Sequence, residues 1–159
     1  MGKMKRINPD LSDLLFRLLF CLIFIGLGGE HLFKDELIQK LMPQWMPFPQ
    51  AISIACGLIL LLGGGLIAAG YKLRFAAILL GTFLIVVTAS VHGPALASAP
   101  NFISEDSEWL WQILQRSNYA KNLCLLGVCL LLLQYKPGRW SLEAWLERKH
   151  SHPDPRNGP

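Results

Sequence analysis

Arg17 is a charged side chain inside a long apolar stretch, where burial of a charge needs a reason. Asp13 lies four residues earlier, so one helix can pair the two groups while the Arg17 head reaches toward water. The other interpretation is an inward contact with another helix, a lipid headgroup or an anionic quinone, because charges within membrane helices are functional candidates. The spacing leaves both interpretations open.

Two histidines mark the other ends of apolar stretches. His31 follows Arg17 by fourteen residues, which at about 100° per residue returns it to nearly the same helix face. Glu30 lies roughly 20 Å from Arg17 along a helix and cannot pair with it. His31 and His92 on facing helices can hydrogen-bond a quinone carbonyl or bind haem, with quinone favoured over haem. Histidines at helix ends more often have structural partners, so this site is a hypothesis.

The remaining reactive side chains predict no chemistry. The four cysteines are interpreted as small apolar packing residues, because each falls inside an apolar stretch and none forms a C-x-x-C pair. No nucleophile–base arrangement and no metalloprotease motif occurs. We therefore assign no catalytic residue and no metal ligand, and do not expect the chain to be an enzyme on its own. The cysteines are Cys21, Cys56, Cys124 and Cys129.

Four apolar segments can position these side chains. They run over residues 11–33, 51–69 and 75–91, with a weaker one over about 119–135. A helix rises about 1.5 Å per residue and a hydrocarbon core is about 30 Å thick, so the first segment is long enough to span it. The prediction is an all-α bundle of four transmembrane helices. Asp10 is the expected N-cap of the first, and Gly63-Gly64-Gly65 gives the second small-residue spacing for close helix packing.

Residues 1–150 are predicted to form one integral membrane domain, and residues 151–159 a disordered tail. Prolines in the 34–50 loop forbid a continuous helix and suggest a cap on the outer membrane surface. The loop from Gly93 to Asn118 carries Trp109 and Trp111, which fit an interfacial aromatic belt.

Lys and Arg counts predict the orientation. The basic residues concentrate in the N-terminal segment, the loop between the second and third helices, and the C-terminal tail. The positive-inside rule then places both termini in the cytoplasm of a multi-pass protein. The net charge of +4 reflects this topology and contact with membrane lipid, with no indication of nucleic-acid binding. The residues counted for this side are Lys3, Lys5, Arg6, Lys72, Arg74, Lys136, Arg139, Arg148, Lys149 and Arg156.

A short amphipathic helix is expected after the fourth span. Ser141 is a suitable N-cap, and Leu142, Trp145 and Leu146 follow at spacings that place them on one face. Such a helix is expected to lie on the cytoplasmic leaflet, with docking of a partner as the alternative.

Several motifs together resemble the DoxX family, whose members are small four-helix membrane proteins of bacteria. Leu14-Leu15-Phe16-Arg17-Leu18-Leu19-Phe20 looks like the opening helix of that family. Arg74-Phe75-Ala76-Ala77 resembles the start of its third helix, and Lys121-Asn122-Leu123 the entry to its fourth. The most specific match is the tail Pro137-Gly138-Arg139-Trp140-Ser141-Leu142-Glu143. Here Glu143 stands where the family commonly has aspartate, and His31 where many members have lysine.

The resemblance implies a role beside redox enzymes, since some relatives are quinone-linked subunits and others are associated with thiol or oxidant defence. We therefore expect an accessory subunit of such a system in the bacterial inner membrane, with a redox partner subunit or a second copy as partner. The alternatives are a non-catalytic scaffold or assembly factor, or a small transport module. The binding candidates are Arg17, Glu30, His31 and His92, and the interfacial tail motif is Gly138, Arg139, Ser141 and Glu143.

Overall fold

The computed structural model describes residues 8–33, 38–39, 42, 45–100 and 103–151. These residues form helices and no strands, so the all-α prediction is confirmed for the described chain. The long helices are α1 (Pro9–Phe33), α3 (Pro49–Ala69), α4 (Leu73–Val87) and α6 (Glu108–Leu132). The shorter elements are η1, a π-helix (Thr88–His92), α5 (Gly93–Ala95), η2, a 3-10 helix (Glu105–Ser107), and α7 (Leu142–Ser151).

Three helical segments are long and apolar enough to cross a membrane: Pro9–Phe33, Pro49–Ala69 and Leu73–Ala95. The first and second begin two residues before the predicted spans. The third extends beyond the predicted 75–91, because η1 and α5 continue α4 without a break. Helix α6 has 25 residues, as many as α1, but its first half is more polar, and it is not among these three segments.

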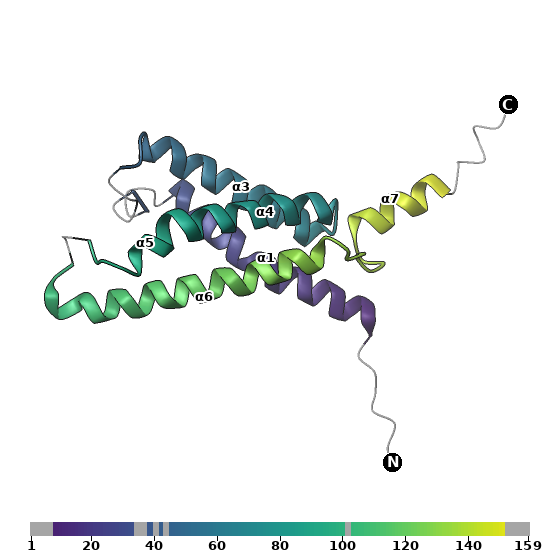
Figure 1. The fold of residues 1–159 in the computed structure, drawn as a ribbon. Helices are drawn as coiled ribbons and strands as arrows, with labels where there is room; N and C mark the ends of the chain where they lie inside the picture. The colour runs from purple at the N-terminus through teal and green to yellow at the C-terminus, as the bar shows by residue number, and fades with distance from the viewer. Residues whose placement is uncertain (1–7, 34–37, 40–41, 43–44, 101–102, 152–159) are drawn as a thin grey trace, which may run out of the picture.

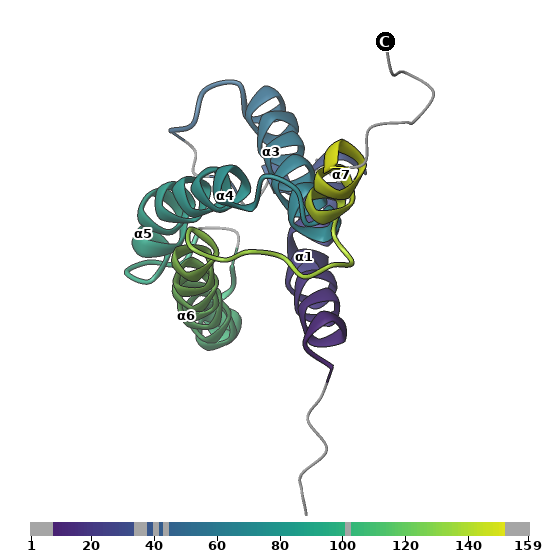
Figure 2. The same ribbon diagram turned by 90° about the vertical axis from the view of Figure 1, so that its right-hand side faces the viewer.

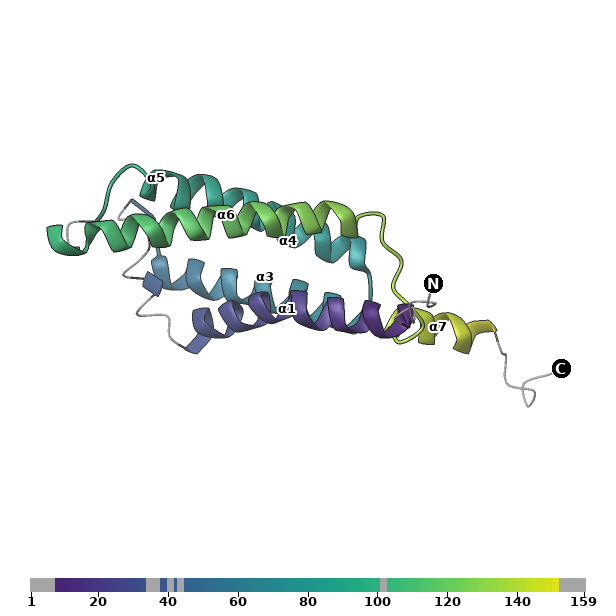
Figure 3. The same ribbon diagram turned by 90° about the horizontal axis from the view of Figure 1, so that it is seen from below.

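The four long helices form an elongated bundle (Figure 1). Helix α1 packs on α3, α3 contacts α4, and α4 packs on α6, so the bundle consists of two pairs joined through α3 and α4 (Figure 3). The start of α1, the turn between α3 and α4, the end of α6 and α7 lie at one end, which we call the joint end. Seen along the bundle, the segment after α6 crosses beneath α4 to reach α1 and α3 (Figure 2).

The ends of α1 and α3 follow from local capping. The Asn8 side chain accepts the Asp10 N–H at 3.0 Å, and Pro9 occupies the first helical position, where its missing N–H costs nothing. Asn8, and not the predicted Asp10, is therefore the N-cap of α1. At the end of α3, Gly70 adopts φ 63°, and the Gly70 and Tyr71 N–H groups return to the carbonyls of Ile67 and Leu66.

The largest error of the sequence prediction concerns α6. The helix begins at Glu108, not near residue 119, and ends at Leu132. Both ends of the predicted Gly93–Asn118 loop are therefore helical, the first in α5 and the second in α6. The first turns of α6 are amphipathic, which hid them from a search for continuous apolar residues. The two predicted belt tryptophans also differ, because Trp109 is exposed whereas Trp111 is buried.

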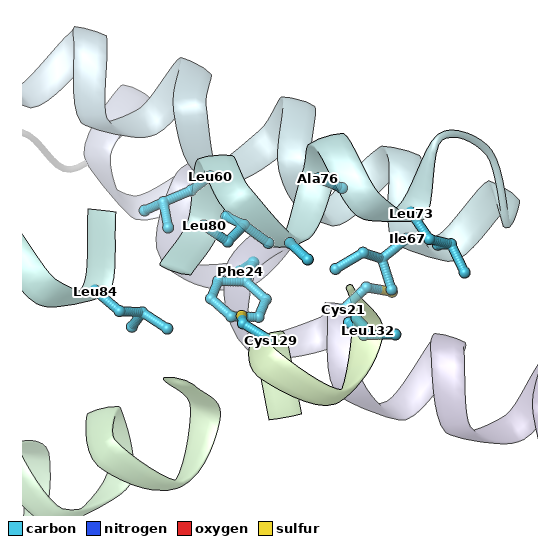
Figure 4. Close-up of a cluster of buried hydrophobic side chains, with 11 residues drawn as sticks. Cys21, Phe24, Leu60, Ile67, Leu73, Ala76, Leu80, Leu84, Cys129 and Leu132 are labelled. Carbon is cyan, nitrogen blue, oxygen red and sulfur yellow. The ribbon is translucent and has the colours of Figure 1, made fainter. Parts of the chain in front are cut away.

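Side chains from all four long helices meet in the core (Figure 4). Phe24 of α1, Leu60 of α3, Leu80 of α4 and Cys129 of α6 are each buried there. The four cysteines are free thiols: Cys21 and Cys129 are buried, Cys56 is half-buried and Cys124 is exposed. This arrangement agrees with the packing role predicted for the two buried thiols.

Glycines allow the closest helix contacts. A Cβ on Gly57 of α3 would lie 3.0 Å from the Gly28 carbonyl oxygen of α1, and one on Gly63 would lie 2.5 Å from Leu80 Cγ of α4. Gly64 faces α1, whereas a Cβ on Gly65 would meet nothing within 4 Å. The predicted packing role of the glycine run thus applies to Gly63 and Gly64 but not to Gly65.

Some sequence predictions fall outside the described residues. They include the N-terminal basic residues 3–6, much of the 34–50 loop, and residues 152–159 of the predicted tail. Ser151, placed in the tail by the sequence prediction, is the last residue of α7.

We expect Gly57→Val to lower the stability of the bundle by about 1–3 kcal/mol, the usual cost of overpacking a tight contact. The Gly28 carbonyl belongs to a helix backbone and cannot rotate away as a side chain would. Gly65→Val is the matched control, because that position faces open space. The apparent melting temperature of the purified protein in detergent measures both. Equal melting of the two variants would contradict the close approach of α1 and α3.

Candidate functional site

Arg17 is completely buried, with none of its surface exposed, and all three of its guanidinium nitrogens have partners. Nε donates to Asp13 Oδ2 at 3.1 Å, Nη1 to the Ala68 carbonyl at 2.6 Å, and Nη2 to the Trp140 carbonyl at 2.8 Å. Nη2 also lies 3.0 Å from Asp13 Oδ2. The predicted ion pair with Asp13 is present, and the side chain makes inward contacts instead of reaching toward water.

The Ala68 contact has a simple electrostatic reason. The last carbonyls of a helix have no partners within it, and the helix dipole makes that end partially negative. A guanidinium at the end of α3 donates to such a carbonyl and also balances the partial negative charge of that helix end. Arg17 therefore acts as a charged C-cap that α1 supplies to α3.

Asp13, the carboxylate in this cluster, is also fully engaged. Its Oδ1 accepts the Tyr135 hydroxyl at 2.9 Å, just after the end of α6. Burial, and the hydrogen bond and negative charge of Asp13, raise the pKa of the Tyr135 phenol above its ordinary value. Tyr135 therefore keeps its proton at physiological pH and continues to donate it. Asp13, Arg17, Ala68, Tyr135 and Trp140 together are called the Arg17 joint.

The tail motif closes over this joint. Gly138 lies so close to α1 that a Cβ there would meet Asp10 Oδ1 at 3.0 Å and Asp13 Oδ2 at 3.1 Å. The Arg139 N–H donates to Asp10 Oδ1 at 3.0 Å, and Arg139 Nε pairs with Asp10 Oδ2 at 2.8 Å. The tail motif therefore lies against both acidic residues in the first turns of α1.

Ser141 and Glu143 attach α7 to the same place. Ser141 Oγ accepts the Ala144 N–H at 3.2 Å, which confirms Ser141 as the N-cap of α7. The Glu143 N–H donates to the Gly70 carbonyl at 3.3 Å. A Cβ on Gly70 would lie 2.6 Å from Ser141 Cβ and 2.7 Å from Arg17 Nη1, so this position has room only for glycine.

These contacts determine the direction of α7. The helix leaves the joint end and runs on away from the bundle (Figures 1 and 3). Gly70 and the Ser141 cap hold the first turn of α7 in this direction. The expected position of this helix on the cytoplasmic leaflet stays a prediction.

At the far end of the bundle, His31 is half-buried against α3. Its Nδ1 lies 3.0 Å from Ser53 Oγ, and the Ser53 hydroxyl donates to the His31 carbonyl at 3.3 Å. Because the hydroxyl has one hydrogen, Nδ1–H is then the donor to Ser53, and Nε2 of the neutral ring is an acceptor. Glu30 beside it is exposed. Arg17 and His31 do share a face of α1, since both contact α3.

His92 has a different partner. Its Nδ1 lies 2.9 Å from Gln115 Oε1 of α6, and an amide oxygen can only accept. Nδ1–H is therefore the donor here too. In the neutral form, each histidine therefore uses its single N–H inside the protein, and that form leaves no ring N–H for a quinone carbonyl.

A half-open pocket lies between α4, η1 and α6, with a volume of about 270 Å³. Thr88 and Asn122 form its polar part: Asn122 Nδ2 donates to Thr88 Oγ1 at 3.0 Å, and both residues are buried. Tyr119 also lines it, and its hydroxyl has no hydrogen-bond partner among the described residues. Neither histidine lines the pocket. Its apolar walls include Leu84, Ile85, Leu123 and Leu126.

The sequence prediction did not single out Thr88, Tyr119 or Asn122 as a site. Asn122 stands there only in a family-like motif, Tyr119 only as the first residue of the predicted 119–135 segment, and Thr88 not at all. The signal that could have found them is an amide within a predicted span, which needs a partner in lipid. The pairing itself depends on η1, a π-helix, and such segments often occur at functional sites.

The described residues contain no group of three His, Cys, Asp or Glu side chains close enough to hold a metal ion. Haem ligation by both histidines would need the two rings to face one gap, but His31 is directed to Ser53 and His92 to Gln115. The pocket therefore combines apolar walls with hydrogen-bonding groups, whereas each guanidinium nitrogen of Arg17 is already engaged within the protein.

We expect Arg17→Met to destabilise the protein by about 3–5 kcal/mol, because it leaves Asp13 as an unpaired buried charge. Arg139→Gln, which breaks the ion pair between the exposed Arg139 side chain and Asp10, should cost at most about 1 kcal/mol. The melting temperature in detergent measures the loss of stability in each variant. Protease cleavage within residues 137–151 measures release of the C-terminal segment. Normal melting and an uncleaved C-terminal segment in Arg17→Met would show that the joint does not hold the fold together.

Comparison with known proteins supports the resemblance seen in the sequence. The family model described as DoxX matches residues 12–93, which is more than half of the chain. The matched range contains α3 and α4 entirely and nearly all of α1, with the Asp13–Arg17 pair and His31. No curated protein and no solved structure matches the chain. The chain is a membrane protein with apolar helices, and it belongs to the DoxX family.

Proposed function

We propose that this protein is a non-catalytic accessory subunit of a quinone-linked redox system in the bacterial inner membrane. The pocket between η1 and α6 holds the quinone headgroup. The observation that carries this proposal is that the pocket combines apolar walls with two side chains, Tyr119 and Asn122, that can each donate a further hydrogen bond.

The chemistry of a quinone fits this lining. Its ring is flat and apolar, and its carbonyl oxygens can only accept hydrogen bonds. The Tyr119 hydroxyl is a free donor, and the Asn122 amide has a second N–H beside the one used by Thr88. Small-molecule sites are typically mostly apolar with a few placed polar groups, at about 300–1,000 Å³, so this pocket suits one ring system.

The proposal places α6 across the membrane as a fourth span. Its 25 residues cover roughly 37 Å, and it packs along α4. Half-buried Lys121 donates to Asn118 at 3.0 Å, which reduces the cost of that charge within the helix. With four spans, the joint end and both termini face the cytoplasm. The pocket then lies in the outer half of the bilayer.

Tyr119→Phe should weaken binding of a short-chain ubiquinone analogue about fivefold, which corresponds to one lost hydrogen bond of about 1 kcal/mol. Titration of the analogue into the protein in nanodiscs measures the change. The matched control is Tyr135→Phe, the same chemical change at the Arg17 joint, which should leave quinone affinity unaltered. Equal affinities in wild type and Tyr119→Phe, or equal losses in both variants, would remove the pocket as the quinone site.

Reporter fusions test the orientation separately. A fusion after Pro159 should behave as cytoplasmic and one after Asn101 as external, because α6 separates the two positions. The same compartment for both fusions would mean that α6 does not cross, and the pocket would then lie at a membrane surface.

A second candidate, a scaffold without a ligand, is favoured by the Arg17 joint. Every nitrogen of its guanidinium and both carboxylate oxygens of Asp13 are used inside the protein. The family-like tail motif serves the same architecture by holding α7 out from the bundle. Absence of quinone binding together with a stable joint would support this second function.

A further inference from the structure

We infer that the joint end carries a binding site for the phosphate group of an anionic phospholipid, formed by Lys72 and Arg74 at the turn between α3 and α4. This site is separate from the quinone pocket. It does not depend on the redox role proposed above.

The first support is unbalanced charge. Lys72, Arg74 and Lys136 are exposed at the joint end, and no described carboxylate lies within ion-pair distance of any of them. Two acidic residues nearby are already used, because Asp13 pairs with Arg17 and Asp10 with Arg139, and Glu143 at the start of α7 makes no ion pair with a described residue. The cations of this turn therefore have no counter-ion within ion-pair distance among the described residues.

The second support is that the joint brings separate basic segments together. The Glu143 N–H reaches the Gly70 carbonyl at 3.3 Å, so the turn lies against the start of α7. Lys72 is two residues from Gly70, and Arg139 is two residues from Ser141. Two residues span at most about 7 Å of chain, so the backbone at Lys72 and at Arg139 lies close to the contact between Gly70 and the start of α7.

The third support identifies a lipid as the occupant in preference to an acidic protein. Arg74 stands at the first turn of α4, and Ile78, one turn further, is 54% exposed on the same face. Ile85 continues this face and is 55% exposed. A phosphate held by Lys72 and Arg74 would thus have its acyl chains beside an apolar helix surface that has no protein cover.

The neighbouring aromatic residues fit the same level of the membrane. Trp140 is 44% exposed, and the Arg139 guanidinium lies 5.7 Å from the centre of its ring. Lys72 Nζ lies 5.4 Å from the centre of the Tyr71 ring. Aromatic side chains and cations gather at the headgroup level, where the ring sits among the lipids and the charge meets phosphate.

The test uses the full-length protein in nanodiscs made of equal parts phosphatidylglycerol and phosphatidylcholine. After detergent extraction at low salt, the phosphatidylglycerol retained per protein should exceed the phosphatidylcholine. The double variant Lys72→Gln/Arg74→Gln should lower this enrichment about fivefold for each cation removed. Raising the salt concentration should lower the enrichment in wild type and leave the variant almost unchanged.

Arg116→Gln/Lys149→Gln is the matched control, because it removes the same charge from the first half of α6, far from the joint end, and from the last turn of α7. This control should retain the wild-type enrichment. Equal losses in both double variants would indicate a diffuse charge effect and overturn the site. No preference for phosphatidylglycerol in wild type would also overturn it, and would leave the turn free for an acidic protein surface.

Discussion

A guanidinium without any exposed surface is the constraint on which the rest of this structure depends. Arg17 can be buried only because Asp13 supplies the opposite charge and two backbone carbonyls accept its remaining donors. Those carbonyls belong to the end of α3 and to the segment after α6, so one side chain fixes three parts of the chain. Removing any one partner would leave a polar group unsatisfied where it cannot reach water. The turn glycine and the tail motif follow from this, since Gly70 and Gly138 are the positions where a larger side chain would touch the charged groups.

The opposite end of the bundle is held together by different interactions. Three pairs of uncharged residue types join helices there: His31 with Ser53, His92 with Gln115, and Asn122 with Thr88. Each pair joins only two helices, and the Tyr119 hydroxyl has no hydrogen-bond partner in the part of the chain that the structure describes. The molecule therefore combines a buried, charged cluster around Arg17 with an opposite end whose pocket retains hydrogen-bonding capacity.

The sequence predicted what depends on local pattern. Long apolar runs located α1, α3 and α4, the four-residue spacing predicted the Asp13–Arg17 pair, and the Ser141 cap located α7. It did not predict α6 before residue 119, because an amphipathic surface helix and a polar loop look alike when only apolar length is counted. Nor could it predict the Ala68 and Trp140 carbonyls as partners, since backbone groups are the same at every residue. The sequence placed both histidines at the ends of apolar segments, but it could not assign Ser53 and Gln115 as their partners, because it does not show which residues of separate helices face each other.

The contact between Arg17 and Trp140 joins residues 123 positions apart. Ribosomes add about 5–20 residues per second, so several seconds pass between the synthesis of α1 and the arrival of its last hydrogen-bond acceptor. Throughout that interval α1 holds a cation that the nascent chain cannot yet satisfy completely. The C-terminal segment therefore completes the biogenesis of the first helix, and a chain that stops before residue 140 lacks a partner for its earliest buried charge.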